Sequence, residues 1–478
     1  MYGLIVIGDD LSSHVAAAVA SKNGIKTALL AENGMGDVCS VGDLTFNVDP
    51  TPLSGFGANQ NYLSLLAGLD ISEERILLDP AYQIILPEKR IDFFNDKEAL
   101  VKELSREFPE LTAKIKSFYD AVERNSQTAG QWLCDHPLIQ PGSAKDYLDF
   151  IKLIPRLIRC KFDDMKLKQM MSQNASFEKV MEAQKVLLSF KTNNQNSLFS
   201  HFQYGVPLRG AYHFSGGKQA LFDSLIKKIE STADGLYINR CEVLSIKKGK
   251  LIELTYMDKD GSASKIEADH LIVSTKWQNM HLVIDRKKKL NLSDFIRPVK
   301  ISHYPFTIHL GVSPDCIPER MARHVAVISD VNKNIYDDNL IILESNAHED
   351  AKNTSTAMIP LLATVFLPND QNIWSKDHLS QTADSIIDRL EYFLPFLKEN
   401  IKFFDIEESI KISQKQRDVV NPKYQMRNAF LSGFAAKKNK TKFGNVYLAG
   451  ASLLADAGFE GEIISGINAA ARVSGKME

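Results

Sequence analysis

The 478-residue sequence lacks the patterns that mark several common classes of protein. Its cysteines are odd in number, lie far apart and form no CxxC pair, which argues against a disulfide framework and against a zinc site. They are Cys39, Cys134, Cys160, Cys241 and Cys316. No stretch reaches the roughly 18 uninterrupted apolar residues of a membrane span, and no basic leader precedes the short apolar run at the amino terminus. We therefore expect a cytoplasmic protein.

The sequence also lacks the short motifs of two large groups of hydrolases and any strong net charge. It contains no HxxxH, HExxH or GxSxG arrangement, so metal-dependent hydrolysis and serine acyl transfer have no support. Lys and Arg number 57 against 59 Asp and Glu, a net charge of −2. Two basic runs, 286–289 and 437–442, have no interleaved aromatic residues on which single-stranded nucleic acid could stack. We expect no metal ion and no nucleic-acid partner.

What the sequence does contain is a strand, helix, strand pattern at its start. Hydrophobic residues make up 44% of the chain, enough for a large buried core. An apolar run at 4–7 ends at Gly8, an alanine-rich helix is predicted near 11–23, and a second apolar run covers 27–30. Because parallel strands need a crossover of this kind, the pattern predicts the opening of an α/β sheet.

The rest of the chain alternates between helical and strand-like segments. Residues 97–200 have helical periodicity and are interpreted as a helical insertion. A Gly-Gly turn then precedes a helix whose apolar positions Leu221, Leu225 and Ile229 share one face. Strands are predicted within 235–246, 250–258 and 269–275, a helix over 376–398, and a final strand and helix at 445–449 and 463–472.

The turn at Gly8 lies where a Rossmann-type sheet would hold a dinucleotide. A diphosphate rests there on the helix amino terminus, and the usual spacing is GxGxxG. Here only the first glycine is present, and Asp10 stands at the middle position beside Asp9. Two like charges roughly 4 Å apart repel by about 4 kcal/mol at an effective dielectric of about 20, which would oppose a phosphate. Alternatively, Asp10 caps the helix when no anion is present.

Four segments, 44–57, 79–110, 212–230 and 445–473, carry a resemblance to a known family. In order and spacing the chain resembles the flavin-containing amine oxidase and carotenoid (phytoene) desaturase superfamily. The resemblance implies an α/β fold in which an FAD/NAD(P)-binding Rossmann-like domain is interleaved with a mixed-sheet and helical substrate domain. It implies a discontinuous FAD-binding-like domain over 1–80, 205–280 and 415–478, and a substrate domain with the helical insertion over 81–204 and 281–414.

The resemblance also implies a set of cofactor-binding positions. They are Gly8, Ser12, Ser13, Glu32, Gly36, Val243, Gly450, Gly458, Gly461, Ser465 and Gly466. Several departures accompany them. Glu32 falls one place after the family's strand-end Glu, and a one-residue slip is expected to turn its side chain to the other face of the sheet. Ala451 replaces an acidic residue after Gly450. No catalytic residue can be identified, because in flavin desaturases the cofactor performs the redox chemistry.

Two functional hypotheses follow from this resemblance. The first is an atypical desaturase-like or amine-oxidase-like oxidoreductase with FAD as cofactor, which acts on or encloses a hydrophobic isoprenoid or lipid-like molecule. The second is a protein that has lost FAD binding and serves as a cofactor-free binding protein or as a non-catalytic partner of an active paralogue.

The segment 147–171 is a candidate for peripheral contact with a membrane. One helical face carries Tyr147, Phe150, Ile151, Ile154, Leu157 and Ile158, with Lys152, Arg156, Arg159 and Lys161 nearby. Such a helix could lie on an anionic membrane surface or could pack on the protein core, and both interpretations stay open. Pro155 is expected to kink it.

Overall fold

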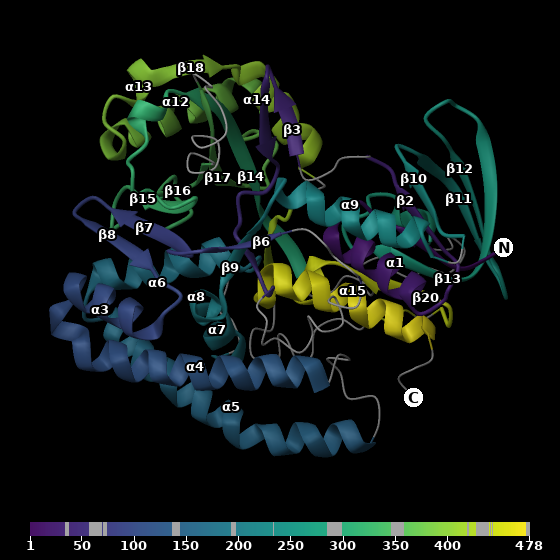
Figure 1. Ribbon diagram of the computed structural model, residues 1–478, viewed down its shortest axis with the longest axis horizontal. Helices are drawn as coiled ribbons and strands as arrows, with labels where there is room; N and C mark the ends of the chain where they lie inside the picture. The colour runs from purple at the N-terminus through teal and green to yellow at the C-terminus, as the bar shows by residue number, and fades with distance from the viewer. Residues whose placement is uncertain are drawn as a thin grey trace.

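The computed structural model describes most of the chain. The described residues are 1–33, 38–56, 69, 74–135, 144–192, 197–232, 234–283, 299–345, 358–417, 420–426, 439, 441 and 443–474. They form two large sheets and a helical lobe (Figure 1).

The first sheet has seven strands and includes the first and the last strand of the described chain. Its order is β10-β2-β1-β13-β12-β11, with β20 also paired to β13. Four of its pairings are parallel: β10 with β2, β2 with β1, β1 with β13, and β13 with β20. Two are antiparallel: β13 with β12 and β12 with β11. The strands are β1 (Tyr2–Ile7), β2 (Thr27–Ala31), β10 (Leu236–Asn239), β11 (Glu242–Lys248), β12 (Ile252–Met257), β13 (Ala263–Ser274) and β20 (Val446–Ala449).

Three helices cover one face of this sheet, and α1 lies between the other two (Figure 1). They are α1 (Leu11–Lys22), α9 (Gly217–Glu230) and α15 (Gly458–Ser474). Every residue of β2 is buried, as expected for a strand covered on both faces. Leu221, Leu225 and Ile229 of α9 are buried on one face. These elements confirm the predicted strand, helix, strand opening, and α15 begins five residues before the predicted helix at 463.

The second large sheet is mixed and has eight strands. Its order is β18-β14-β17-β16-β15-β7-β8, with β19 also paired to β14. The strands are β7 (Tyr82–Leu86), β8 (Lys89–Phe93), β14 (Val299–Val312), β15 (His324–Ile328), β16 (Leu340–Ser345), β17 (Ile359–Pro368), β18 (Ile401–Phe404) and β19 (Lys423–Met426). Helices α12 (Lys376–Phe393), α13 (Leu397–Asn400) and α14 (Ile406–Gln416) lie beside it (Figure 1). Two small sheets are formed by β3 (Val38–Val41) with β4 (Leu44–Asn47), and by β5 (Leu53–Ser54), β6 (Arg75–Leu78) and β9 (Ala211–Phe214).

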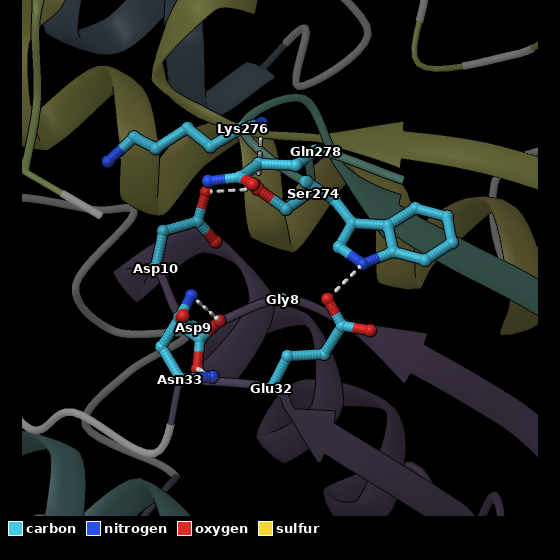
Figure 2. A pocket seen from close by; sticks show the side chains of 9 residues that line it. Gly8, Asp9, Asp10, Glu32, Asn33, Ser274, Lys276 and Gln278 are labelled. Atoms are coloured by element: carbon cyan, nitrogen blue, oxygen red, sulfur yellow. Dashed lines mark hydrogen bonds between the residues drawn. The ribbon is translucent and has the colours of Figure 1, made fainter. Parts of the chain in front are cut away.

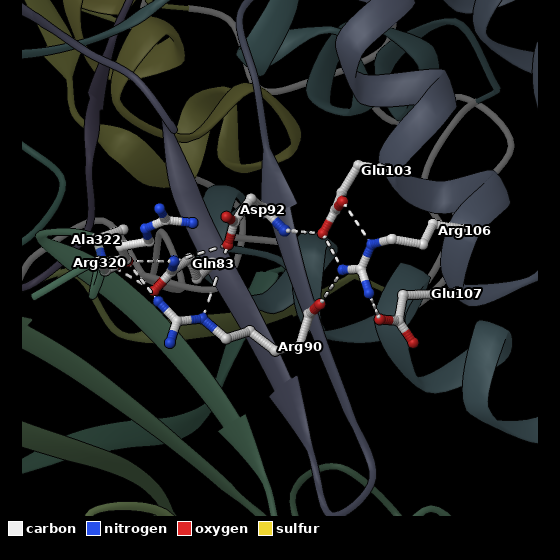
Figure 3. Close-up of polar contacts among 8 residues, drawn as sticks. All are labelled: Gln83, Arg90, Asp92, Glu103, Arg106, Glu107, Arg320 and Ala322. Atoms are coloured by element: carbon white, nitrogen blue, oxygen red, sulfur yellow. Dashed lines mark hydrogen bonds and ion pairs between the residues drawn. The ribbon is translucent and has the colours of Figure 1, made fainter. Parts of the chain in front are cut away.

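A polar network links the β7–β8 hairpin, at the edge of the second large sheet, to the segment that precedes β15 (Figure 3). The Gln83 side chain donates to the Asp92 carboxylate at 2.7 Å and to the Arg320 carbonyl at 2.8 Å, and it accepts from the Ala322 amide at 2.8 Å. Because Gln83 is fully buried, these bonds satisfy groups that would otherwise be costly to bury. On the other side of the hairpin, the Arg106 guanidinium pairs with Glu103 at 2.6 Å.

The helical lobe joins the two sheets and confirms the predicted helical insertion. It consists of α3 (Lys97–Glu107), α4 (Thr112–Asp135), α5 (Ala144–Met171), α6 (Ala175–Leu188), α7 (Ser197–Tyr204) and α8 (Val206–Arg209). Helix α5 continues through Pro155. Within the described ranges, every helix is too short or too polar to cross a bilayer. The fold class is therefore the expected one, an α/β Rossmann-like sheet interleaved with a mixed sheet and helices, while the domain boundaries stay a prediction.

Candidate nucleotide site at the β1–α1 turn

Gly8 forms the tight turn between β1 and α1. Its φ of +152° lies at the limit of the region that favours glycine. A β-carbon at this position would stand 2.6 Å from the β-carbon of Ser274, at the end of β13, and would also collide with the Ser13 hydroxyl. The close approach of the neighbouring strand therefore requires a glycine here, whether or not a ligand is bound.

Asp10 is the N-cap of α1, and the structure confirms the capping interpretation. Its Oδ1 accepts from the Ser13 amide at 3.0 Å and from the hydroxyls of Ser12 and Ser13 at 2.9 and 2.6 Å. Its Oδ2 accepts from the Ser274 hydroxyl at 2.6 Å (Figure 2). Asp10 is only 5% exposed. A carboxylate of this chain thus takes the helix amino terminus that a phosphate occupies in dinucleotide-binding folds.

Glu32 lies in the same pocket, which corrects the expectation that it points to the other face of the sheet. Its Oε1 accepts from the Val243 amide at 2.8 Å, and its Oε2 accepts from the Trp277 indole at 2.7 Å. The expectation was wrong because β2 ends at Ala31. Glu32 follows the strand, where the alternation of side chains no longer fixes its direction.

The Val243 amide is therefore engaged within the chain. The resemblance implies that backbone at this position meets an adenine ring, but here the Glu32 carboxylate is the acceptor. The neighbouring Asp9 accepts from the backbone and side-chain nitrogens of Asn33 at 3.1 and 3.2 Å. Of the other predicted positions, Gly36 lies outside the described residues.

The carboxyl-terminal positions meet around the start of α15, where they pack against this chain's own backbone. The Gly450 amide donates to the Ser465 hydroxyl at 2.9 Å. β-carbons at Gly458, Gly461 and Gly466 would collide with the carbonyl oxygens of Leu188, Leu454 and Ser12 respectively. These glycines therefore serve close packing between elements, a role that explains them without a flavin ring.

Sequence reasoning missed four residues of the site: Ser274, Lys276, Trp277 and Glu462. Ser274 ends β13, and Lys276 and Trp277 follow it, at the carboxyl edge of the parallel strands, where ligand-binding groups of such sheets gather. The polar residues at the end of the predicted strand 269–275 and just after it were the signal that could have pointed to them.

Glu462 is a fully buried carboxyl group whose pKa is raised to about 7. Burial is the main cause, and the Asp10 carboxylate adds to it. Two groups lower this pKa instead. The Lys276 Nζ lies 3.7 Å from Glu462 Oε1, and the Asn421 side-chain amide donates to Glu462 Oε2 at 3.1 Å. The attraction is too weak to offset burial, so this carboxyl group keeps its proton to a higher pH than an ordinary glutamate does.

The turn leaves a cavity of about 50 Å³ lined by Gly8, Asp9, Asp10, Glu32, Asn33, Ser274, Lys276, Trp277 and Gln278 (Figure 2). Sites for small molecules are typically about 300–1,000 Å³. The lining contributes three carboxylates against one ammonium group, so its field opposes a diphosphate. Among the described residues, the arrangement at this turn does not fit a dinucleotide placed as the resemblance implies. The described residues also contain no cluster of His, Cys, Asp and Glu suited to a metal ion.

The sheet topology and the position of the turn define the class of protein. The family of flavin-containing amine oxidoreductases matches residues 36–474, and the chain belongs to it. The resemblance inferred from the sequence is thereby confirmed.

Individual relatives are distant. A 4,4'-diapophytoene desaturase (4,4'-diapolycopene-forming) of Methylomonas sp is 22% identical over an alignment of 418 residues that covers 81% of this chain and 78% of the relative. A structure of wild-type putrescine oxidase bound to putrescine matches with a TM-score of 0.61 at 12% identity and covers 100% of this chain and 98% of its own. An oxidoreductase from Methanosarcina mazei matches with a TM-score of 0.61 at 14% identity over 97% and 98% of the two chains. These structures show the shared fold.

Proposed function

We propose that this member of the flavin-containing amine oxidoreductase family has lost FAD binding and acts as a cofactor-free binding protein for a hydrophobic isoprenoid or lipid-like molecule. The observation that carries the proposal is the Asp10 carboxylate, which caps α1 and accepts four hydrogen bonds within the chain. A diphosphate would have to displace an anion that is already buried and satisfied.

Two further contacts support the loss of FAD. The Glu32 carboxylate accepts from the Val243 amide, so a nucleotide base would have to break a charge-assisted hydrogen bond. The buried Glu462 adds a second acidic group close to Asp10. Among the described residues, a dianionic diphosphate would thus meet several carboxylates and one lysine of the lining, Lys276.

The class of ligand is proposed from the desaturase relative, whose name describes the conversion of a hydrophobic carotenoid precursor. A cavity of about 300 Å³ between α4 and α5 offers apolar surface to such a guest from Phe118, Ala121 and Met170, although five of its nine lining residues are polar. A non-catalytic partner of an active paralogue would share the same loss of flavin.

The proposal is tested by flavin binding. Protein purified under native conditions should lack the visible absorbance of oxidised flavin and should not quench FAD fluorescence on titration. The double variant Asp10→Gly with Glu32→Ala removes both competing carboxylates and should gain measurable FAD affinity. Asp96→Gly is the matched control, because Asp96 also caps a helix, with a 2.8 Å bond to the Ala99 amide, but lies far from the site. Flavin in near-stoichiometric amount in the wild-type protein would refute the proposal.

A flavin-dependent oxidoreductase is the second candidate, and the retained Gly458, Gly461, Ser465 and Gly466 favour it. Under this alternative, FAD would be held through backbone contacts after a rearrangement of Asp10 and Glu32. The same titration separates the two functions, since only the oxidoreductase binds FAD without substitutions.

A further inference from the structure

Helix α5 carries a row of exposed large apolar side chains on the outside of the molecule. The row consists of Leu148, Ile151, Ile154, Ile158, Phe162 and Met165. At 3.6 residues per turn these positions lie within about 120° of the helix circumference. Ile158 and Phe162, for example, are 52% and 60% exposed. Elsewhere in the described residues, exposed large apolar side chains occur only singly or in adjacent pairs, so α5 holds a contiguous patch. We call these six residues the α5 stripe.

The opposite face of α5 fixes the orientation of the stripe. Leu153 and Cys160 belong to one hydrophobic core, and Leu167 and Met170 belong to another. All four are 4% exposed or less. The helix cannot rotate to bury the stripe without exposing these side chains. In Figure 1, α5 lies along the lower edge of the molecule, below α4. The stripe differs from the predicted apolar face, because Leu157 is half-buried and Leu148, Phe162 and Met165 extend the row. The side chains of Tyr147 and Phe150, which the prediction included, lie outside the described residues.

Charged residues of α5 are sorted between its two sides. Six basic residues are exposed beside the stripe: Lys152, Arg156, Arg159, Lys161, Lys166 and Lys168. Two acidic residues whose side chains the structure describes turn inward, since Asp164 lies 3.4 Å from the His201 ring and Asp163 accepts from the Asn125 amide at 3.3 Å. By helical spacing, basic residues flank the stripe on both sides. An apolar centre with a basic border is the pattern of helices that lie in a membrane interface.

We propose that α5 docks in the plane of an anionic lipid bilayer, with the stripe inserted between headgroups and the flanking basic residues bound to lipid phosphates. Charge favours this partner over a second copy of the chain. In a two-fold dimer through the stripe, the basic borders of the two copies would face each other and repel. The inference does not depend on whether the β1–α1 turn binds FAD.

The experiment is co-sedimentation of the full chain with vesicles. Vesicles of equal parts phosphatidylglycerol and phosphatidylcholine should bind the wild-type protein, and phosphatidylcholine vesicles should bind it far more weakly. The variant Arg156→Glu with Arg159→Glu should bind at least about 20-fold less, because each basic residue near an anionic surface contributes about fivefold. Lys250→Glu with Lys259→Glu, two exposed lysines on hairpin turns, is the matched control and should bind like the wild type.

The apolar contribution is tested separately. Ile158→Glu with Phe162→Glu should also reduce binding at least about tenfold, while Leu244→Glu, at an exposed apolar position on β11, should leave binding unchanged. Unchanged binding of the stripe variant would overturn the proposal, as would a wild-type protein that ignores anionic vesicles. Conversion of a wild-type dimer to a monomer by the stripe variant, without vesicle binding by either, would instead identify a second copy as the partner and would equally refute the membrane proposal.

Discussion

The β1–α1 turn and the outer face of α5 differ in whether their energetically costly groups have partners. At the turn these groups are carboxylates that are buried or half-buried, and on α5 they are apolar side chains exposed to water. At the turn, the carboxylates of Asp10 and Glu32 find donors within the chain, from Ser12, Ser13 and Ser274 to the Val243 amide. On α5, the apolar stripe remains exposed although the helix is firmly packed on its other side. In the first region the carboxylates of Asp10 and Glu32 have partners within the chain, whereas the second region leaves apolar surface that an outside partner would cover. Whether a site inherited with a fold still binds its ligand can be assessed from which of its groups still lack partners within the chain.

The largest effect is expected at Gly458, and it tests whether the turn region is held by close packing. Gly458 has a φ of +56°, and a β-carbon there would collide with the Leu188 carbonyl, a backbone atom that cannot move alone. Gly458→Ala should lower the free energy of unfolding by at least about 3 kcal/mol. Urea denaturation followed by circular dichroism measures the change. The control Gly261→Ala, at a hairpin glycine with open space around it, should cost clearly less. Equal losses would show that the packing at Gly458 is unimportant.

The second effect concerns the buried acid at the turn. The pKa of Glu462 is raised from 4.5 to about 7, so the folded state binds this proton more tightly than the unfolded state. The resulting stability is fully present below pH 4.5 and is lost as the pH rises through about 7. The whole change is roughly 3 kcal/mol. Glu462→Gln should remove it, so that the variant gains stability relative to the wild type between pH 5 and 8. Parallel stability profiles for the two proteins would contradict the assignment.

A third effect compares two helix caps. Asp10→Ala removes a buried cap with hydroxyl partners on both α1 and β13, and it should cost about 2 kcal/mol. Asp96→Ala removes an exposed cap of α3 and should cost about 1 kcal/mol. Thermal unfolding of both variants measures the difference. If Asp10→Ala were instead more stable than the wild type, the buried carboxylate would be destabilising, which would indicate that it normally pairs with a cation.

The smallest effect is expected on the α5 stripe. Because Ile158 is exposed, Ile158→Ser should change the free energy of unfolding by less than about 0.5 kcal/mol. Leu167→Ala, on the buried face of the same helix, should cost about 2–5 kcal/mol. Chemical denaturation of the two variants tests whether the stripe contributes to the free energy of unfolding. A large loss at Ile158 would mean that the chain itself covers this face.

Local patterns in the sequence predicted much of the fold. The apolar runs on either side of the alanine-rich segment give β1, α1 and β2, and the spacing of Leu221, Leu225 and Ile229 gives the buried face of α9. These features depend on neighbours a few residues away. The capping role of Asp10 was also within reach, because it depends on the amides of its own helix.

The candidate site was only partly predictable. The Ser274 hydroxyl reaches Asp10 across 264 positions, and the raised pKa of Glu462 depends on burial between distant segments. The direction of Glu32 depends on where β2 ends, which the strand pattern does not fix to one residue. On α5, helical spacing predicts apolar faces but cannot say which of them meets the core, since α4, α6 and α7 supply the contacts.

The inner face of α5 has a mechanical consequence. Leu153 and Cys160 are embedded in the core beneath the first sheet, and Leu167 and Met170 in the core beside the β7–β8 hairpin. The same helix therefore packs against two separate hydrophobic cores of the molecule. Adsorption of its outer side would set the height and tilt of the entire body above a lipid surface, and amide hydrogen exchange should slow in both cores at once.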